Sequence, residues 1–241
     1  AATAITAITV QNTLGVQAVH PVPAELVGEQ MQAVMEDLRP DAIKIGMTGN
    51  VEIISEIARL LHQYSPRQVV LDPVMVSTSG HNLMTDEAVE AICTLLLPEV
   101  SLVTPNLHEA AVLLQQPIHT VDDMEHAAHL VYEKYHCACL VKGGHLTGNE
   151  MCDVLYDGHE LHLFGARRIH SGNLHGTGCT LSSAIATFLA QGFPLYEAVE
   201  LAKTYITKAI EAGKDLHIGQ GNGPLCHFPY LVNPVNPLTE E

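Results

Sequence analysis

The sequence predicts an α/β domain with a doubly wound, mostly parallel sheet, and three observations support this prediction. Short apolar runs alternate with segments of helical period along most of the chain. Polar residues follow several of these runs. No internal repeat, low-complexity tract or linker divides the 241 residues, which suffice for one large core. We therefore expect a single domain over residues 1–241.

The predicted strands are short and the predicted helices flank them. The apolar runs that we assign to strands are residues 42–46, 69–71, 101–103 and 139–141. The segments with helical period are 23–38, 51–64, 86–97 and 122–136. The first of these carries an apolar stripe made of Leu26, Val27, Met31, Val34, Met35 and Leu38. Thr85 or Asp86 is expected to cap the helix over 86–97.

The pattern changes in the last third of the chain. Two short strands are predicted between residues 150 and 170, around the hairpin turn signal Asp157-Gly158. From Thr177 onward, apolar periodicity predicts two long helices over 177–191 and 195–213.

Chemically useful side chains follow three predicted strands. Asp72 follows the second strand, Thr104-Pro105-Asn106 the third, and Lys142-Gly143-Gly144-His145 the fourth. In open α/β sheets, ligands bind beyond the carboxyl ends of the strands. We therefore expect these residues to share one rim with the loop at 176–179.

The tetrapeptide Gly176-Thr177-Gly178-Cys179 lies where that loop enters an apolar helix. Glycines let the backbone turn tightly, so that its N–H groups approach an anion. A helix N-terminus favours phosphate and lowers the pKa of a thiol placed there. The tetrapeptide indicates phosphoryl transfer to a small alcohol. A buried structural cysteine at a common type of helix entry is the alternative.

Composition and charge narrow the class of protein. The formal charge of −16 argues against nucleic acid or an anionic membrane as the main partner. No apolar run reaches the roughly 20 residues that span a bilayer, and no secretory leader begins the chain, so we expect a cytoplasmic protein. The six cysteines form no CxxC pair and are expected to be reduced. Since residue 1 is Ala1, we expect that a segment precedes it in the intact protein.

Fifteen histidines raise the question of a metal site. His126 and His129 share a helical face, and His159 and His162 share a strand face. Neither pair has a third ligand at a helical or strand offset, so both pairs are expected to be solvated.

Seven strings together resemble the hydroxymethylpyrimidine (phosphomethylpyrimidine) kinases of thiamine biosynthesis, within the ribokinase-like superfamily. The strings are Gln11-Asn12-Thr13, Lys44-Ile45-Gly46-Met47, Asp72-Pro73-Val74-Met75, Thr104-Pro105-Asn106-Leu107-His108-Glu109, Lys142-Gly143-Gly144-His145, His175-Gly176-Thr177-Gly178-Cys179-Thr180 and Gly219-Gln220-Gly221-Asn222-Gly223-Pro224. The strings occur in the family's order, and the resemblance covers residue 1 to about 228. The resemblance implies a three-layer α/β/α sandwich with a mostly parallel central sheet, and a homodimer.

The sequence departs from this family in two places. Members begin with a strand and a glycine-rich loop that carries an acidic substrate ligand, and no such segment is present ahead of Ala1. Leu174 stands where the family more usually has Thr, which removes a hydroxyl but leaves the anion loop intact.

The resemblance assigns catalytic and ATP-binding roles to the rim. Cys179 is implied as the general base that deprotonates the substrate hydroxyl, and the N–H groups of residues 176–179 as an anion hole. Lys142 and Thr104 are implied to bind ATP. Asn106 and Glu109 match an Asn-x-x-Glu motif that positions Mg²⁺, largely through water. The alternatives are a solvated Lys142, and a helix cap at Asn106 with a solvated Glu109.

The remaining implied roles concern the metal rim and the substrate. Asp72 is implied either near Mg²⁺ or as a ligand of a monovalent cation, with a cap of the following turn as the alternative. Gln11 is implied to hydrogen-bond the pyrimidine, and Met47 and Val74 to contact its ring. Asp153 and residues 219–223 lie in family-like strings to which we assign no chemistry.

The function implied is ATP-dependent phosphorylation of 4-amino-5-hydroxymethyl-2-methylpyrimidine and of its monophosphate. One alternative is pyridoxal kinase, because pyridoxal is also a flat heterocycle with a primary hydroxyl. The other is a catalytically silent relative that binds the ligand. Retention of Cys179, Asn106, Glu109 and Lys142 argues against that silent relative.

Overall fold

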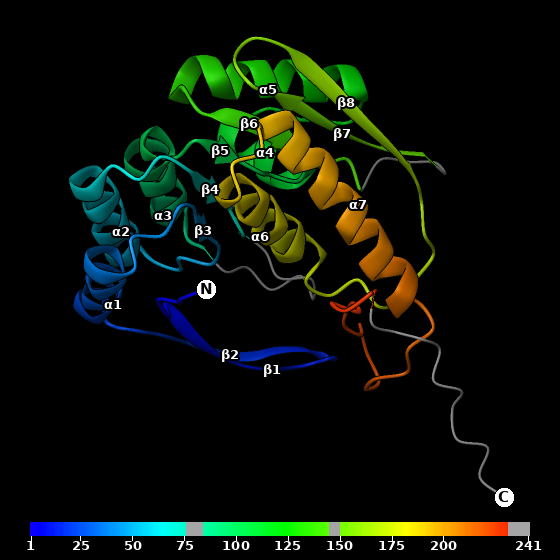
Figure 1. The fold of residues 1–241 in the computed structure, drawn as a ribbon, viewed down its shortest axis with the longest axis horizontal. Helices are drawn as coiled ribbons and strands as arrows, with labels where there is room; N and C mark the ends of the chain where they lie inside the picture. Colours follow the sequence, from blue (N-terminus) through cyan, green and yellow to red (C-terminus); the bar gives the residue numbers. More distant parts are fainter. Residues whose placement is uncertain (76–83, 145–149, 231–241) are drawn as a thin grey trace, which may run out of the picture.

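A six-stranded sheet forms the centre of the computed structural model, which describes residues 1–75, 84–144 and 150–230 (Figure 1). Its strands follow the order of the chain: β3 (Ile43–Ile45), β4 (Val69–Leu71), β5 (Leu102–Val103), β6 (Ala138–Val141), β7 (Glu150–Tyr156) and β8 (Leu161–Arg167). The first four strands are parallel, whereas β7 and β8 pair antiparallel. The prediction of a mostly parallel sheet is confirmed.

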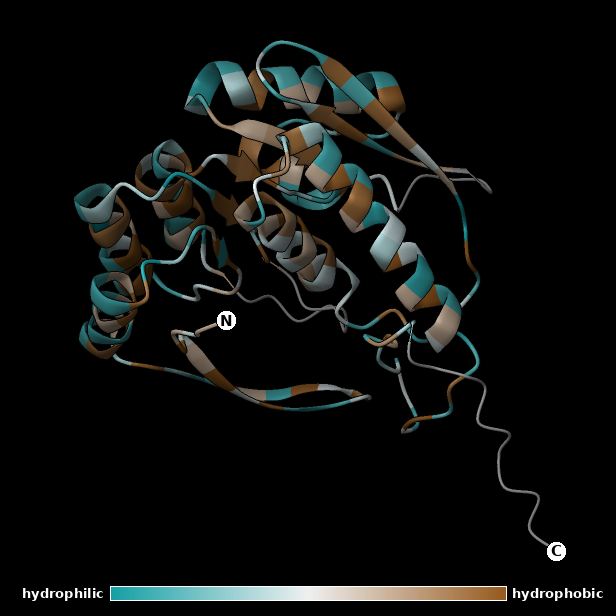
Figure 2. Cartoon of the chain, viewed as in Figure 1, coloured by the Kyte–Doolittle hydropathy of each residue, from teal (hydrophilic) through white to brown (hydrophobic). Residues whose placement is uncertain are grey.

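Helices cover both faces of this sheet. One face carries α1 (Ala24–Asp37), α2 (Val51–Tyr64), α3 (Asp86–Ala91), α4 (Leu107–Leu114) and α5 (Val121–Tyr135). The other carries α6 (Thr177–Ala190) and α7 (Leu195–Gly213). Strand side chains alternate between the layers: Leu71 packs into the first core and Val70 into the second. Figure 2 shows the apolar residues on the central strands and on the helix sides that face them.

Most predicted elements occur within a few residues of their predicted bounds. The strand 69–71 and the helix 51–64 coincide with β4 and α2. Thr85 caps α3, as expected, by accepting a hydrogen bond from the Ala88 N–H at 3.3 Å. The helix predicted over 86–97 is not one α-helix, because α3 continues as a π-helix over Ile92–Leu96 and a 3₁₀ turn over Leu97–Glu99.

The six-residue stripe predicted for α1 is too wide. Val27 is fully buried, but Leu26 is 47% exposed and Leu38, which caps the helix, is 61% exposed. Met31, Val34 and Met35 are half-buried and line a hollow that also borders β3 and α6. The buried face of α1 is therefore narrower than its stripe of apolar residues.

The sequence did not predict the hairpin of β1 (Ala7–Asn12) and β2 (Gly15–Pro21), which lies apart from the main sheet (Figure 1). Its base is fastened by the Thr6 hydroxyl, which donates to the Met47 carbonyl at 2.7 Å. At its tip, Thr13 Oγ1 accepts from the N–H groups of Gln220 and Gly221, each at 3.2 Å. The hairpin thus joins the end of β3 to the loop at 219–223.

No described helix is long and apolar enough to cross a membrane.

Candidate active site

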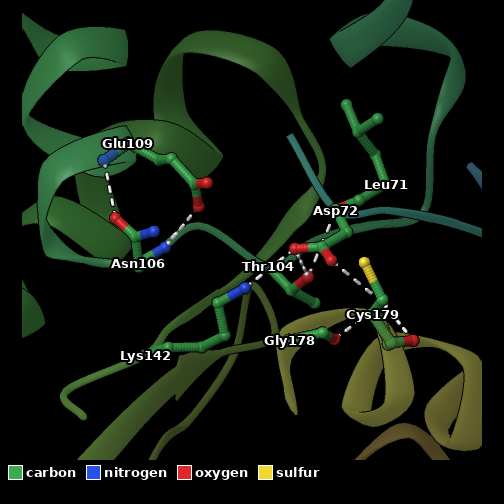
Figure 3. A network of polar contacts seen from close by, with 9 residues as sticks. Leu71, Asp72, Thr104, Asn106, Glu109, Lys142, Gly178 and Cys179 are labelled. Carbon is green, nitrogen blue, oxygen red and sulfur yellow. Dashed lines mark hydrogen bonds and ion pairs between the residues drawn. The ribbon is translucent and has the colours of Figure 1, made fainter. Parts of the chain in front are cut away.

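The carboxyl ends of β4, β5 and β6 meet the N-terminus of α6 at one rim (Figure 3). Asp72 follows β4, Thr104 follows β5 and Lys142 follows β6. The Lys142 ammonium lies 2.8 Å from Asp72 Oδ1, and the Thr104 hydroxyl donates to the same oxygen at 3.4 Å. The structure therefore brings together the strand-end residues that the sequence predicted to share a rim.

Asp72 and Lys142 form an ion pair that is almost removed from water. The side chains are 2% and 15% exposed, respectively. Burial by itself lowers the pKa of Lys142, but the Asp72 and Glu109 carboxylates outweigh it and raise that pKa above its ordinary value. Lys142 therefore remains a cation at the rim. The alternative of a solvated strand-end lysine is wrong.

Asn106 and Glu109 build the start of α4 as a capping box. The Asn106 side chain accepts from the Glu109 N–H at 2.9 Å, and Glu109 Oε2 accepts from the Asn106 N–H at 2.8 Å. The alternative predicted a helix cap at Asn106 and a solvated Glu109. The cap is present, but Glu109 is only 4% exposed, so it is not solvated. Burial raises the pKa of Glu109, against the opposing charge of Lys142. A cation bound beside this carboxylate would stabilise its charged form, which burial disfavours.

The entry of α6 is shaped by Gly176, which caps the helix with a left-handed φ of 85°. The Thr177 N–H was expected to bind an anion, but it donates to the Leu174 carbonyl at 3.3 Å, and the Thr177 hydroxyl donates to the same oxygen at 2.7 Å. Thr177 is therefore not available to an anion. The N–H groups of Gly176, Gly178 and Cys179 find no acceptor among the described residues. Of the four N–H groups predicted to form an anion hole, these three are therefore left.

Gly178 lies directly beside the ion pair. A Cβ at this position would lie 3.2 Å from Lys142 Nζ and 3.7 Å from Asp72 Oδ2. Any larger residue would fill the space between the helix N-terminus and the lysine. The N–H groups at this helix N-terminus and the nearby Lys142 ammonium are donors that suit a phosphate group.

Cys179 lies at the third position of α6 and is exposed as a residue. Its thiol is nevertheless partly desolvated, and this desolvation raises the pKa of Cys179 above its ordinary value. The ammonium groups of Lys44 and Lys142 lower this pKa, whereas the charge and hydrogen-bond acceptor of Asp72 raise it. The expectation of a lowered thiol pKa is wrong for the chain alone, since burial and a neighbouring carboxylate outweigh the two cations.

The three residues predicted to bind the substrate lie at different depths. Val74 is half-buried and adjoins the rim, since its N–H donates to the Asp72 carbonyl at 2.8 Å. Met47 is half-buried at the end of β3. Gln11 is exposed on β1, next to the register shift between Val10 and Gln11. In the described part of the chain, no hydrogen bond joins Gln11 to the rim.

Sequence analysis assigned no role to Ser182 or to Lys44, whose charge lowers the pKa of Cys179. The Ser182 hydroxyl is fully buried and lies 3.3 Å from Asp72 Oδ2, and it also contacts the Gly178 and Cys179 carbonyls at 3.0 and 3.1 Å. It links α6 to Asp72. The available signal was a polar residue inside an apolar helix, and for Lys44 a charge inside an apolar strand.

The histidine pairs lie outside this rim. Among the residues that the structure describes, no group of three His, Cys, Asp or Glu side chains is arranged to hold a metal ion. His129 and His162 are half-buried rather than solvated: the His129 ring lies 3.8 Å from that of Tyr156, and His162 lies 3.6 Å from Asp157.

Comparisons with known proteins show the family of this chain. The family model described as phosphomethylpyrimidine kinase matches residues 1–226. A hydroxymethylpyrimidine/phosphomethylpyrimidine kinase of Rhizobium meliloti (strain 1021) is 50% identical over 228 residues, which cover 94% of this chain and 85% of that protein. The thiamine biosynthesis bifunctional protein ThiED of Geobacter sulfurreducens is 45% identical, and the match covers 93% of this chain but 45% of that protein.

Two solved structures share the fold. Phosphomethylpyrimidine kinase from Clostridium difficile 630 has a TM-score of 0.77 and 42% identity, over 86% of this chain and 85% of the other. Pyridoxal kinase from Staphylococcus aureus, in complex with AMP-PCP and pyridoxal, has a TM-score of 0.84 and 31% identity, over 94% and 82% of the two chains. The fold accordingly serves more than one substrate among the proteins that this chain resembles.

Proposed function

The chain belongs to the phosphomethylpyrimidine kinase family, and we propose that it phosphorylates 4-amino-5-hydroxymethyl-2-methylpyrimidine, and then its monophosphate, at the expense of ATP in thiamine biosynthesis. The observation that carries this proposal is the rim where a buried lysine–aspartate pair lies beside Cys179 and the N–H groups of Gly176, Gly178 and Cys179, which have no acceptor in the described part of the chain. A kinase needs a cation and donors for the transferred phosphoryl group and a base for the acceptor. All three occur together here.

The first transfer would use the rim residues as follows. The Cys179 thiolate takes the proton of the primary hydroxyl, whose oxygen attacks the γ-phosphorus of ATP. The bond from that phosphorus to the bridging oxygen breaks and ADP leaves. Lys142 and the N–H groups of Gly176, Gly178 and Cys179 stabilise the charge that develops on the transferred group. In the second transfer a phosphate oxygen of the monophosphate is the nucleophile.

Mg²⁺ fits this rim through few protein ligands. Asp72, Asn106 and Glu109 are the residues that would hold it, largely through water, which suits an ion that retains most of its hydration shell. When bound, it would neutralise phosphate charge. The oxygens of Asp72 already contact Lys142, Thr104 and Ser182, so Glu109 is the better candidate for Mg²⁺.

We further propose that the protein acts as a homodimer in the cytoplasm, as the family resemblance implies. For the substrate, Gln11 supports the pyrimidine over pyridoxal, because an amide pairs with both donor and acceptor atoms of an aminopyrimidine edge. Gln11 reaches the substrate only if the β1–β2 hairpin, which is fastened at Met47 and at residues 220–221, lies over the bound ligand.

Turnover with the two alcohols tests the proposal directly. Purified protein is incubated with ATP and either hydroxymethylpyrimidine or pyridoxal, and ADP and the phosphorylated products are quantified. We expect the pyrimidine to give first a monophosphate and then a diphosphate, with the higher kcat/KM. Preferential turnover of pyridoxal would assign the chain to vitamin B6 salvage, and binding of either compound without ADP formation would indicate a silent relative.

Replacing Glu109 by Gln is expected to raise the Mg²⁺ concentration required for half-maximal rate. The amide oxygen of Gln can still accept the Asn106 N–H, so the cap of α4 is kept while the charge is removed. Mg²⁺ titration of the initial rate, with unfolding temperature as the control, measures this. An unchanged Mg²⁺ requirement would restrict Glu109 to capping.

Gln11→Leu is expected to weaken pyrimidine binding about 5- to 150-fold, the equivalent of leaving one polar group of the ligand unpaired. ATP affinity should stay within about twofold. The measurement is calorimetric titration of each ligand into both proteins. Gln17→Leu, a change at another exposed glutamine of the same hairpin, is the matched control. Equal pyrimidine affinity in wild type and Gln11→Leu would remove Gln11 from the site.

A further inference from the structure

A second buried ion pair lies beside the rim and has no part in the chemistry described above. Lys203 of α7 places its Nζ 2.5 Å from Asp153 Oδ2 of β7. The two side chains are only 15% and 10% exposed. Burying two charges is costly unless they are paired and hydrogen-bonded. We therefore looked for a function of this pair beyond stability.

The other carboxylate oxygen of Asp153 reaches the strand end that carries Lys142. Asp153 Oδ1 accepts the Gly143 N–H at 2.8 Å, in a buried contact. The antiparallel register of β6 and β7 pairs Val141 with Val154, which puts Asp153 opposite Lys142. The side chain of Asp153 therefore holds the backbone one residue beyond the lysine.

The same strand end is held from its other side. The Lys142 N–H donates to the Pro105 carbonyl at 2.8 Å, next to the cap of α4. With Asp153 on Gly143, the N–H groups on both sides of the Lys142 Cα have fixed partners. The direction in which the lysine leaves the backbone is thereby set, which supports its 2.8 Å contact with Asp72.

We propose that Asp153 and Lys203 form a positioning pair that holds Lys142 in place for the phosphates of ATP. Asp153 fixes the Gly143 backbone, and Lys203 compensates the buried carboxylate and ties it to α7. Neither residue contacts the reacting atoms. This proposal rests on the function proposed above, because it requires Lys142 to bind phosphate.

A positioning pair and an ion pair that serves stability alone predict different effects on ligand binding. An ion pair that serves stability alone would alter the unfolding temperature and leave the balance between phosphate and nucleoside recognition unchanged. A positioning pair would weaken binding of ligands that carry phosphates and spare a ligand without them, since Lys142 acts on the phosphates.

The experiment compares AMP-PCP and adenosine as ligands of Asp153→Ala, Asp153→Asn and wild type, by calorimetry or by inhibition of turnover. Asp153→Ala should weaken AMP-PCP binding about 5- to 150-fold, because the Gly143 N–H loses its acceptor, and leave adenosine within about twofold. Asp153→Asn keeps an oxygen acceptor, so its loss should be smaller. The matched control is Asp157→Ala, which removes an acceptor of the His159 and Glu160 N–H groups at the turn of the same hairpin and should affect only stability.

Lys203→Met provides the second test, which remains informative if Asp153→Ala does not fold. Alone it leaves the Asp153 charge unpaired and should weaken AMP-PCP binding, and joined to Asp153→Asn it should recover part of the loss. Equal weakening of AMP-PCP and adenosine, or unchanged AMP-PCP binding with a lowered unfolding temperature, would overturn the positioning role. Failure of wild type to phosphorylate the pyrimidine would instead overturn the proposed function, independently of these comparisons.

Discussion

Replacing Cys179 by Ser is expected to reduce turnover about 10²- to 10⁴-fold, the usual contribution of a general base, with little change in the affinity for ATP. Ser has nearly the same size as Cys and keeps the start of α6, but its hydroxyl does not ionise in the working pH range. Steady-state kinetics with hydroxymethylpyrimidine, and titration of ATP, measure the two effects. Turnover close to wild type in Cys179→Ser would remove Cys179 as the base.

The pH profile carries the same prediction with a definite sign. Burial raises the pKa of Cys179, so the thiol is protonated over more of the neutral range than an exposed thiol, and the thiolate forms as pH rises. The kcat/KM for the alcohol should therefore increase with pH into the alkaline range. Lys44→Met removes a charge that lowers this pKa and should displace the rise to higher pH. A flat profile in both proteins would contradict a thiolate base.

Alkylation supplies the control for these kinetics. Cys179 is exposed, whereas Cys137 is 1% exposed and burial raises its pKa to about 12. Iodoacetamide should label Cys179 before Cys137, faster as pH rises, and bound substrate should slow the reaction. Equal labelling of both cysteines would indicate local unfolding rather than an accessible base.

The sequence was most informative where one local rule acts. Parallel strands end at one edge, so polar residues directly after Leu71, Val103 and Val141 were expected to meet, and the Asp72–Lys142 contact agrees. The glycines at 176 and 178 are also a local signal, and they predicted the entry of α6. The capping box of Asn106 and Glu109 is equally local, and its spacing was visible in the sequence.

What sequence analysis missed depends on contacts between distant residues. Ser182 and Asp72 are 110 positions apart, and Lys203 and Asp153 are 50 apart, so no periodicity indicated either contact. The raised pKa of Cys179 follows from packing and from Asp72, which the helix N-terminus alone did not reveal. The hairpin β1–β2 escaped because its register shifts between Val10 and Gln11, which weakens the alternation that predicts strands.

Replacing Lys142 by Met should have the largest combined effect on stability and activity. Asp72, 2% exposed, would keep the Thr104 and Ser182 hydroxyls but lose its only cation at hydrogen-bond distance among the described residues. Removing one partner of a buried pair costs about 3–5 kcal/mol, because the other charge is left uncompensated. Chemical denaturation should show this loss, and the KM for ATP should rise in the protein that remains folded.

The double variant Asp72→Asn/Lys142→Met separates the two effects. Without a buried charge left unpaired, its stability should recover a large part of the loss, since replacing both partners of a buried pair is often close to neutral. Its ATP affinity should not recover, because the cation beside Gly178 is still absent. Lys208→Met, at an exposed lysine of α7, is the control and should change neither property. Recovery of activity together with stability would mean that Lys142 serves the fold alone, and that another group of the rim neutralises the phosphates.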